Sequence, residues 1–304
     1  MKTIDFMSKA RFAAVVSVVL VVMSVASLAI KHLELGLDFT GGTLLEVGTP
    51  QAVELNKVRD ALTEAGFDDA VVQHFGAATE LLIRVPPDDA IDNKTELGNA
   101  VFKVLKGIEP LVELKRNEFV GPQVGEELRD QSGLAMVIAL GCMLLYITLR
   151  FQFKFAIGAV LALFHDVIIT LGLFSMFGLQ FDLTVLAALL AVIGYSLNDT
   201  IVVSDRIREN FLGLRGYSPI NVINLSLNQT LSRTLVTSLT TFLVLLALLF
   251  LGGESIRGFA IALTFGVLVG TYSSIYVASN TLLMMNIQKE DFFQPEKEEL
   301  DDRP

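Results

Sequence analysis

Long apolar runs alternate with polar stretches along the chain. Six runs are long enough to cross a bilayer, because a transmembrane helix needs about 20 mostly apolar residues. They cover residues 12–30, 133–149, 155–177, 183–204, 231–251 and 259–285. Only the connection after the first run is long, at roughly 100 residues. The pattern predicts an all-α membrane bundle of six helices with one inserted domain.

The hydrophobic period changes within the inserted stretch, residues 31–130. Alternating apolar positions predict strands, and apolar positions at helical spacing predict helices. The predicted strands cover 43–47, 71–75, 80–85 and 111–120, and the predicted helices cover 53–65 and 89–106. Residues 35–42 read as a glycine turn before the first strand, and residues 76–79 join the second and third strands. The order β-α-β-β-α-β predicts an α+β domain of the ferredoxin-like type.

Composition and charge agree with this division. Apolar residues make up 52% of the chain and charged residues 18%, against about 25% in soluble domains. The inserted stretch carries 10 Lys and Arg against 19 Asp and Glu, so it holds nearly all of the net charge of −10. The chain has no stripe of basic residues that could neutralise phosphates, so we do not expect it to bind nucleic acid. No metal-ligand spacing or nucleophile with a base occurs, so we expect no enzyme activity, cofactor or metal. The single cysteine, Cys142, is expected to pack.

Positive charges predict the orientation of the spans. Lys and Arg lie before the first run, between the second and third, and after the fourth and sixth. The short loop 178–182 has none, and the loop 252–258 has only Arg257. The positive-inside rule therefore places both termini in the cytoplasm and residues 31–130 in the periplasm. The predicted divisions are 1–30, 31–130, the five spans within 131–287, and a cytoplasmic acidic tail, 288–304.

The first run has an alternative interpretation as a signal peptide. Its basic start and the sequence Ser24-Val25-Ala26 resemble a signal with cleavage after Ala26. The run is long for such a signal, so a retained first span is the preferred interpretation. Cleavage would leave five spans and an N-terminal periplasmic domain.

Two opposite charges lie at similar depth in the fourth and fifth runs. At 1.5 Å per residue, Asp199 lies about 24 Å and Arg233 about 27 Å from the outer ends of their helices. Charges inside a membrane are costly and are functional candidates by default. We expect the two to pair. The alternatives are a purely structural buried pair and an arginine that reaches for the cytoplasmic surface.

Other polar residues accompany this predicted pair. Ser196 and Asn198 precede Asp199, and a polar stripe on the fifth run is expected to face the bundle interior or a water path. The stripe consists of Ser226, Gln229, Arg233, Thr237 and Thr240.

A third candidate, Asp166, lies about 16 Å from the outer end of the third run. It could handle a proton or serve a structural hydrogen-bonding role. The adjacent His165 is expected to face a different direction on the helix.

The sixth run carries small residues at every fourth position, which favour close helix packing. These are Ala262, Gly266, Gly270, Ser274 and Ala278.

Three motifs resemble one known family over nearly the whole chain. Residues 37–42 read LDFTGG, residues 194–210 read GYSLNDTIVVSDRIREN, and residues 226–233 read SLNQTLSR. They closely resemble the SecF branch of the SecD/SecF family of the bacterial Sec protein-export machinery. This family belongs to the resistance-nodulation-division superfamily.

The resemblance implies a subunit of the Sec preprotein translocase in the cell inner membrane. Such a subunit pairs with SecD, docks on SecYEG, and works beside YajC and YidC. It uses the proton-motive force to promote late steps of preprotein translocation. The residues implied in proton passage are Asp199 and Arg233, together with Asp166.

Two other functions remain open from the sequence. One is a proton-coupled efflux subunit of the same superfamily, although those pumps usually carry twice as many spans in one chain. The other is a scaffold subunit without transport activity, in which Asp199 and Arg233 would serve only fold specificity.

Overall fold

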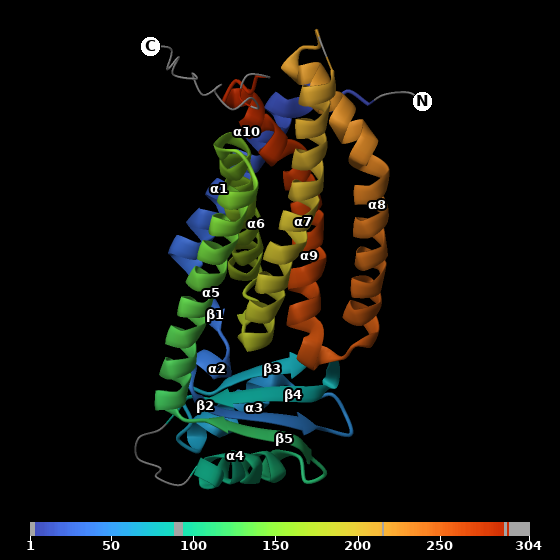
Figure 1. Cartoon of the computed structure of the whole chain (residues 1–304). Coiled ribbons are helices and arrows are strands. Elements are labelled where there is room, and N and C mark those ends of the chain that lie inside the picture. Colours follow the sequence, from blue (N-terminus) through green and yellow to red (C-terminus); the bar gives the residue numbers. More distant parts are fainter. Residues whose placement is uncertain (1–3, 88–93, 215, 289–290, 292–304) are drawn as a thin grey trace, which may run out of the picture.

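The computed structural model describes residues 4–87, 94–214, 216–288 and 291. Within them, six helical segments are long and apolar enough to cross a membrane, which confirms the predicted number of spans. They are α1 (Ala10–Lys31), α5 (Pro122–Arg150), α6 (Phe153–Phe177), α7 (Leu183–Gly213), α8 (Pro219–Leu251), and a sixth made of α9 (Arg257–Ser273), the π-helical segment η3 (Ser274–Ala278) and α10 (Ser279–Met284). The start of α1 and the whole of α10 lie at one end of the bundle, and the sheet lies at the other (Figure 1).

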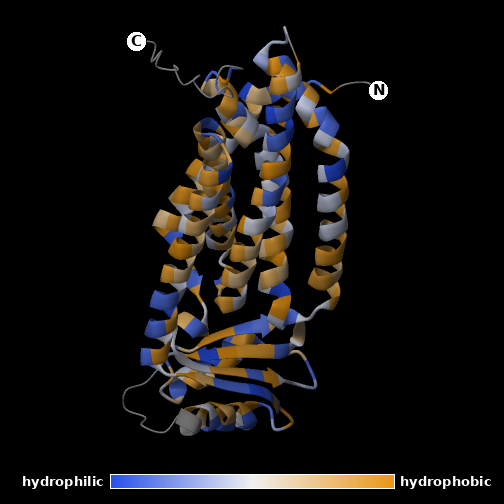
Figure 2. Cartoon of the chain, in the orientation of Figure 1, coloured by the Kyte–Doolittle hydropathy of each residue, from blue (hydrophilic) through white to orange (hydrophobic). Residues whose placement is uncertain are grey.

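The helices differ in how deeply they are buried. α6, α7 and α9 form the centre of the bundle, whereas α1, α5 and α8 expose most of their apolar surface. α1 packs along α6, and α8 packs against α7 and α9. Figure 2 shows that the middle of the bundle is largely hydrophobic and that polar residues gather at the helix ends. The exposed apolar surfaces suit contact with lipid or with another membrane subunit.

Three helices extend beyond the apolar runs that predicted them. α5 begins at Pro122, α7 continues to Gly213 and α8 begins at Pro219. Hydropathy locates only the part of a helix that suits the bilayer core, so it misses polar turns that continue outside it. At the end of α7, Asn210 Nδ2 donates to Ser226 Oγ of α8 at 2.8 Å, which joins two of these extensions.

A four-stranded antiparallel sheet forms the inserted domain. Its spatial order is β3 (Val71–Phe75), β4 (Ala77–Val85), β2 (Gly42–Gly48) and β5 (Glu113–Val120). Two helices, α3 (Leu55–Glu64) and α4 (Lys94–Ile108), pack on one face over a common apolar core. The chain order is therefore β-α-β-β-α-β, as the periodicity predicts. Residues 88–93, where the second predicted helix starts, lie outside the described residues.

The hairpin between β3 and β4 is tighter than the sequence predicts. Phe75 pairs with Ala77 across Gly76, so residues 77–79 belong to the strand and not to a loop. Gly76 has a φ of 78°, a value that lets two strands reverse over one residue. The other predicted strands and helices of the domain shift by a few residues at their ends.

Short elements that hydropathy does not detect connect the domain to the bundle. β1 (Glu34–Leu35) pairs in parallel with β6 (Gln180–Phe181), which lies just before α7. The expected glycine turn contains a helical turn, α2 (Leu37–Thr40), and ends at Gly41 and Gly42. Asp38 Oδ2 accepts a hydrogen bond from the backbone amide of Leu183 at 3.0 Å. These contacts fix the connection after α1 to the start of α7.

Arg84 of β4 joins the sheet to this connection. Its guanidinium donates to the carbonyl oxygen of Leu35 at 2.8 Å and to Thr40 Oγ1 at 3.1 Å. Burial lowers the pKa of Arg84, and the nearby Glu34 carboxylate opposes that shift. Because arginine loses its proton only far above neutral pH, the side chain stays charged at neutral pH.

The contact between α1 and α6 depends on Gly172. A Cβ atom placed there would lie 2.2 Å from the Ser24 side chain of α1. Gly172→Ala is expected to lower the free energy of unfolding by about 1–3 kcal/mol, the usual cost of overpacking. Gly141→Ala in α5 is the control, because a Cβ there meets nothing within 4 Å. Thermal unfolding in detergent should show a lower midpoint for Gly172→Ala and an equal or higher midpoint for Gly141→Ala. Equal midpoints for both variants would contradict this packing.

Candidate functional site

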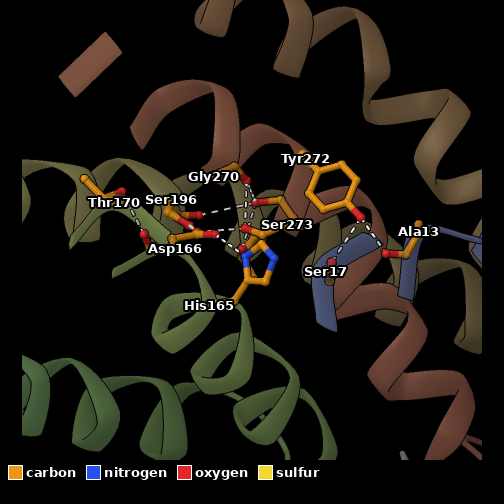
Figure 3. Close-up of polar contacts among 11 residues, drawn as sticks. Ala13, Ser17, His165, Asp166, Thr170, Ser196, Gly270, Tyr272 and Ser273 are labelled. Atoms are coloured by element: carbon orange, nitrogen blue, oxygen red, sulfur yellow. Dashed lines mark hydrogen bonds and ion pairs between the residues drawn. The ribbon is translucent and has the colours of Figure 1, made fainter. Parts of the chain in front are cut away.

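Asp166 of α6 is the best-held carboxylate inside the bundle. It is 1% exposed, and both of its oxygens have partners. Oδ1 lies 2.9 Å from His165 Nδ1, while Oδ2 accepts from Ser196 Oγ at 2.5 Å and from Ser273 Oγ at 2.7 Å (Figure 3). A buried charge is tolerated when it is paired and hydrogen-bonded. The carboxylate therefore joins α6, α7 and α9 in one polar network.

The local sequence explains how this network forms in an apolar setting. Small residues on α9 allow α7 to approach closely, since a Cβ at Gly270 would lie only 3.1 Å from Ser196. This proximity brings hydroxyl groups of both helices to one carboxylate. Thr170 Oγ1 donates to the backbone carbonyl of Asp166 at 2.7 Å and so satisfies its own hydroxyl one turn along α6.

The position of His165 differs from the prediction. Its ring does not point away from Asp166, since Nδ1 lies within hydrogen-bond distance of the carboxylate. The ring also stacks on Tyr272 of α9, with centroids 6.0 Å apart and planes inclined by 27°. The Tyr272 hydroxyl donates to the carbonyl oxygen of Ala13 at 2.7 Å and lies 3.0 Å from Ser17 Oγ. The network around Asp166 thus reaches α1.

Asp199 of α7 lies in a less polar setting. It is 5% exposed, and its Oδ2 has no hydrogen-bond partner among the described residues. The carboxylate lies close enough to Thr234 and Arg233 of α8 to interact with them electrostatically. Thr234 Oγ1 also has no hydrogen-bond partner among the described residues, so no direct hydrogen bond joins Thr234 to Asp199. A buried carboxylate oxygen without a hydrogen-bond partner lowers the stability of the fold. This oxygen is the place where a proton or a partner group would be added.

The predicted ion pair between Asp199 and Arg233 is wrong for the described chain. Their charged atoms do not approach within the 4.0 Å of an ion pair, and Arg233 is exposed. The depth estimate is compatible with a pair, but depth does not define rotation about the helix. On α8 the buried neighbour Thr234 faces α7, and successive helical side chains point about 100° apart. Arg233 consequently points to the surface of the chain.

The polar stripe on α8 is also not in the interior. Gln229, Arg233, Thr237 and Thr240 are exposed, and only Ser226 is buried. Gln229 Oε1 accepts from Arg206 and Asn210 at the end of α7. An exposed polar face on a membrane-spanning helix calls for a partner or a water-filled path, because lipid cannot satisfy it.

Of the other predicted supporting residues, some lie in the interior of the bundle and others lie at its surface. Ser196 lies at the Asp166 carboxylate, whereas Asn198 is exposed. Thr237 donates to the backbone carbonyl of Arg233 in its own helix, at 3.1 Å. Only Ser196 among the predicted supporting residues therefore contacts a buried carboxylate directly.

The small residues of the sixth span line the contact with α7. A Cβ at Gly266 would lie 2.2 Å from Val192, and Ser274 Oγ lies 2.9 Å from Thr200 Oγ1. The helix changes to π-helical form at Ser274, next to Ser273. Such π-bulges are frequent at functional sites. The four-residue spacing predicts the ladder but gives no signal for Ser273 or Tyr272, which lie beside it.

Two further expectations concern cysteine and metals. Cys142 is exposed on α5 and does not pack within the chain, contrary to the prediction, because α5 presents most of its surface outward. Within the described ranges, no group of three or more His, Cys, Asp and Glu could hold a metal ion.

Comparisons with known proteins agree with the motifs. The family model described as "Protein export membrane protein SecD/SecF, C-terminal" matches residues 100–288, and the "SecD/SecF GG Motif" model matches residues 26–53. The chain belongs to the SecD/SecF family. The matched residues 26–53 contain one pair of adjacent glycines, Gly41 and Gly42, at the junction between α2 and the sheet.

Two SecF relatives match along nearly their whole length. The protein translocase subunit SecF of Vibrio alginolyticus is 51% identical over 100% of this chain and 98% of its own. The SecF of Pseudomonas aeruginosa is 52% identical over 99% of this chain and 98% of its own.

A solved structure of SecDF from Thermus thermophilus, described as a translocon-associated membrane protein, has a similar fold. It superposes with a TM-score of 0.83 at 41% identity, over 94% of this chain and 39% of that chain. A second SecDF structure, in a form called super-membrane-facing, gives a TM-score of 0.70 over the same shares. The described chain therefore corresponds to less than half of SecDF.

Proposed function

We propose that the chain is the SecF-type subunit of a protein translocase, and that it uses the proton-motive force to promote late steps of preprotein translocation across the bacterial inner membrane. Its full-length relatives are named as SecF subunits of the translocase. The observation that carries the coupling to protons is the pair of buried carboxylates. Asp166 lies in a hydrogen-bonded network, and Asp199 has an uncovered oxygen. Intramembrane carboxylates mark proton relays in pumps and transporters.

The orientation and domain division form part of this proposal. Both termini are cytoplasmic, and residues 31–130 form a periplasmic domain. Its strand order and chain order support a ferredoxin-like type. Residues 131–287 hold the other five spans and residues 288–304 a cytoplasmic tail, most of which lies outside the described residues. The domain couples motion and has no enzymatic role.

The exposed polar face of α8 supports a second membrane subunit as partner. The name SecDF and the 39% share of that chain suggest that a SecD-type subunit supplies the rest. Arg233 would then lie at the subunit contact, close enough to Asp199 for a long-range electrostatic interaction. SecYEG, YajC, YidC and the unfolded preprotein are further proposed partners.

The mechanism follows from the charge on Asp199. A proton from outside neutralises this carboxylate and removes its attraction for Arg233. The helices repack, and α1 and α5 transmit the change to the outer domain. A membrane potential contributes about 2.3 kcal/mol per charge per 100 mV, enough to bias a two-state element.

Cross-linking tests the predicted partner surface. In a Cys142→Ser background, Thr240→Cys on the polar face of α8 should cross-link to the SecD-type subunit in membranes, because that face needs polar contacts. Val18→Cys on α1 is the control, since it is similarly accessible at 62% exposure but apolar. Cross-linking at Val18 and none at Thr240 would place the partner elsewhere.

Proton flux through the assembled translocase tests the function itself. Asp199→Asn keeps the shape of the side chain but cannot carry a proton. We expect normal assembly with the partner, loss of proton flux, and loss of the proton-dependent part of preprotein translocation. Translocation at the wild-type rate by this variant would rule out the relay. Loss of translocation with unchanged proton flux would favour a scaffold.

A further inference from the structure

His165 is a buried ionisable side chain that the mechanism above does not use. It is 6% exposed, and its two ring nitrogens have different surroundings. Nδ1 lies 2.9 Å from Asp166 Oδ1, while Nε2 has no hydrogen-bond partner among the described residues. Figure 3 shows the ring beside Asp166 and near Tyr272. A buried polar atom without a partner needs an explanation, and one explanation is an exchanging water or proton.

The hydrogen bonds define which tautomer the ring adopts. A charged Asp166 carboxylate has no proton to donate, so Oδ2 accepts from Ser196 and Ser273 and Oδ1 can only accept from the ring. The facing nitrogen, Nδ1, therefore carries the ring proton when the carboxylate is charged. Nε2 then carries no proton, and its lone pair can receive one. The two nitrogens of one imidazole can in this way accept and release a proton on opposite sides.

We propose that His165 is the proton-relay residue that loads Asp166, an inference that rests on the proposed proton-coupled function. A proton carried by water binds at Nε2 and gives an imidazolium ion. The Nδ1–H bond then breaks and its proton passes to Asp166 Oδ1. The products are a neutral imidazole with its proton on Nε2 and a neutral carboxylic acid. One proton has entered from a hydronium ion, which becomes water as one of its O–H bonds breaks; at the site, one N–H bond has formed, one has broken, and one O–H bond has formed on Asp166.

The surroundings of the ring suit such a relay. Asp166 from its own helix and Tyr272 from α9 are the titratable groups found against it, while α1 and α7 contribute the uncharged Ser17 and Ser196 to the same network. Tyr272 is anchored to the Ala13 carbonyl oxygen, so its ring holds the imidazole in position against Asp166. No other charged side chain is hydrogen-bonded or ion-paired to the ring in the described part of the chain.

The test replaces His165 in the complete translocase with its partner subunit, in membranes. His165→Gln retains a donor toward Asp166 but cannot pass a proton, so proton flux and proton-dependent translocation should fall roughly 100-fold, as when a general acid–base group is lost. His74→Gln is the control, since His74 is exposed on the sheet. His165→Ala should recover flux when imidazole is added, an effect that a purely structural role would not produce.

The outcomes separate this inference from the function on which it rests. If Asp199→Asn abolishes flux while His165→Gln retains it, the relay through His165 is overturned and the proposed function stands. If both variants transport normally, the proposed function fails as well. Nitrogen NMR of the wild-type ring covers the case in which the variants do not assemble. A proton on Nδ1 that moves to Nε2 as the pH falls supports the relay, and a ring with its proton fixed on Nε2 overturns it.

Discussion

Asp166→Asn is expected to abolish proton-dependent translocation and to weaken the bundle at the same time. The asparagine amide presents one acceptor oxygen and one donor nitrogen, whereas three groups now converge on two acceptor oxygens. The amide oxygen can replace Oδ2 and accept from Ser196 and Ser273, but the amide nitrogen then faces His165 Nδ1, and two N–H donors cannot bond each other. An unsatisfied buried group costs about 1–3 kcal/mol, so the thermal midpoint should fall. The variant can neither hold a charge nor take up a proton.

Asp130→Asn is the matched control for this change. Asp130 has a side chain that is 80% exposed and lies at the outer part of α5. Its replacement should alter neither the midpoint nor the translocation rate. The measurements are thermal unfolding of the purified chain and translocation into membrane vesicles with an imposed proton gradient. Normal translocation by Asp166→Asn would limit Asp166 to a structural role.

The sequence predicts the fold well where one physical signal dominates. Length and hydropathy define the six spans, and period defines the strands and helices of the inserted domain. The signal fails at elements that are held by a few tertiary contacts. β1 and β6 are two residues each, and their pairing joins segments far apart in the chain. No local pattern identifies such a pair.

The candidate site shows a different limit to what can be predicted from the sequence. Depth along a helix can be calculated from sequence, and Asp166 and Asp199 both lie within helices that are long and apolar enough to cross a membrane. Rotation about the helix axis depends on the packing of neighbours, and this is why the interior position expected for Arg233 is wrong. The partners of Asp166 come from three helices, and the hydroxyl groups of serine are too common in membrane helices to stand out. A π-helical segment beside Ser273 has no sequence signal either.

Gly42→Ala is expected to disrupt the pairing of β2 with β4 at the end of the sheet that follows α2. Gly42 has a φ of 117°, and a Cβ there would lie 2.4 Å from the carbonyl oxygen of Val85. The neighbouring pair Thr43 and Val85 belongs to the ladder between β2 and β4, so this clash falls on the central strands. The left-handed backbone costs a non-glycine residue about 1–2 kcal/mol before any clash is counted. We expect faster proteolysis of the outer domain and loss of translocation.

Gly66→Ala separates the clash from the backbone strain. Gly66 has a φ of 91° at the end of α3, but a Cβ there meets nothing within 4 Å. This variant should lose only the backbone contribution, about 1 kcal/mol, and should keep translocation close to the wild-type rate. The difference between the two variants then measures what the contact with Val85 adds. If Gly42→Ala is no more sensitive to protease than Gly66→Ala and still translocates, the glycine pair does not transmit force between the sheet and the spans. If Gly42→Ala alone fails, translocation depends on the close approach of β2 and β4 at this glycine.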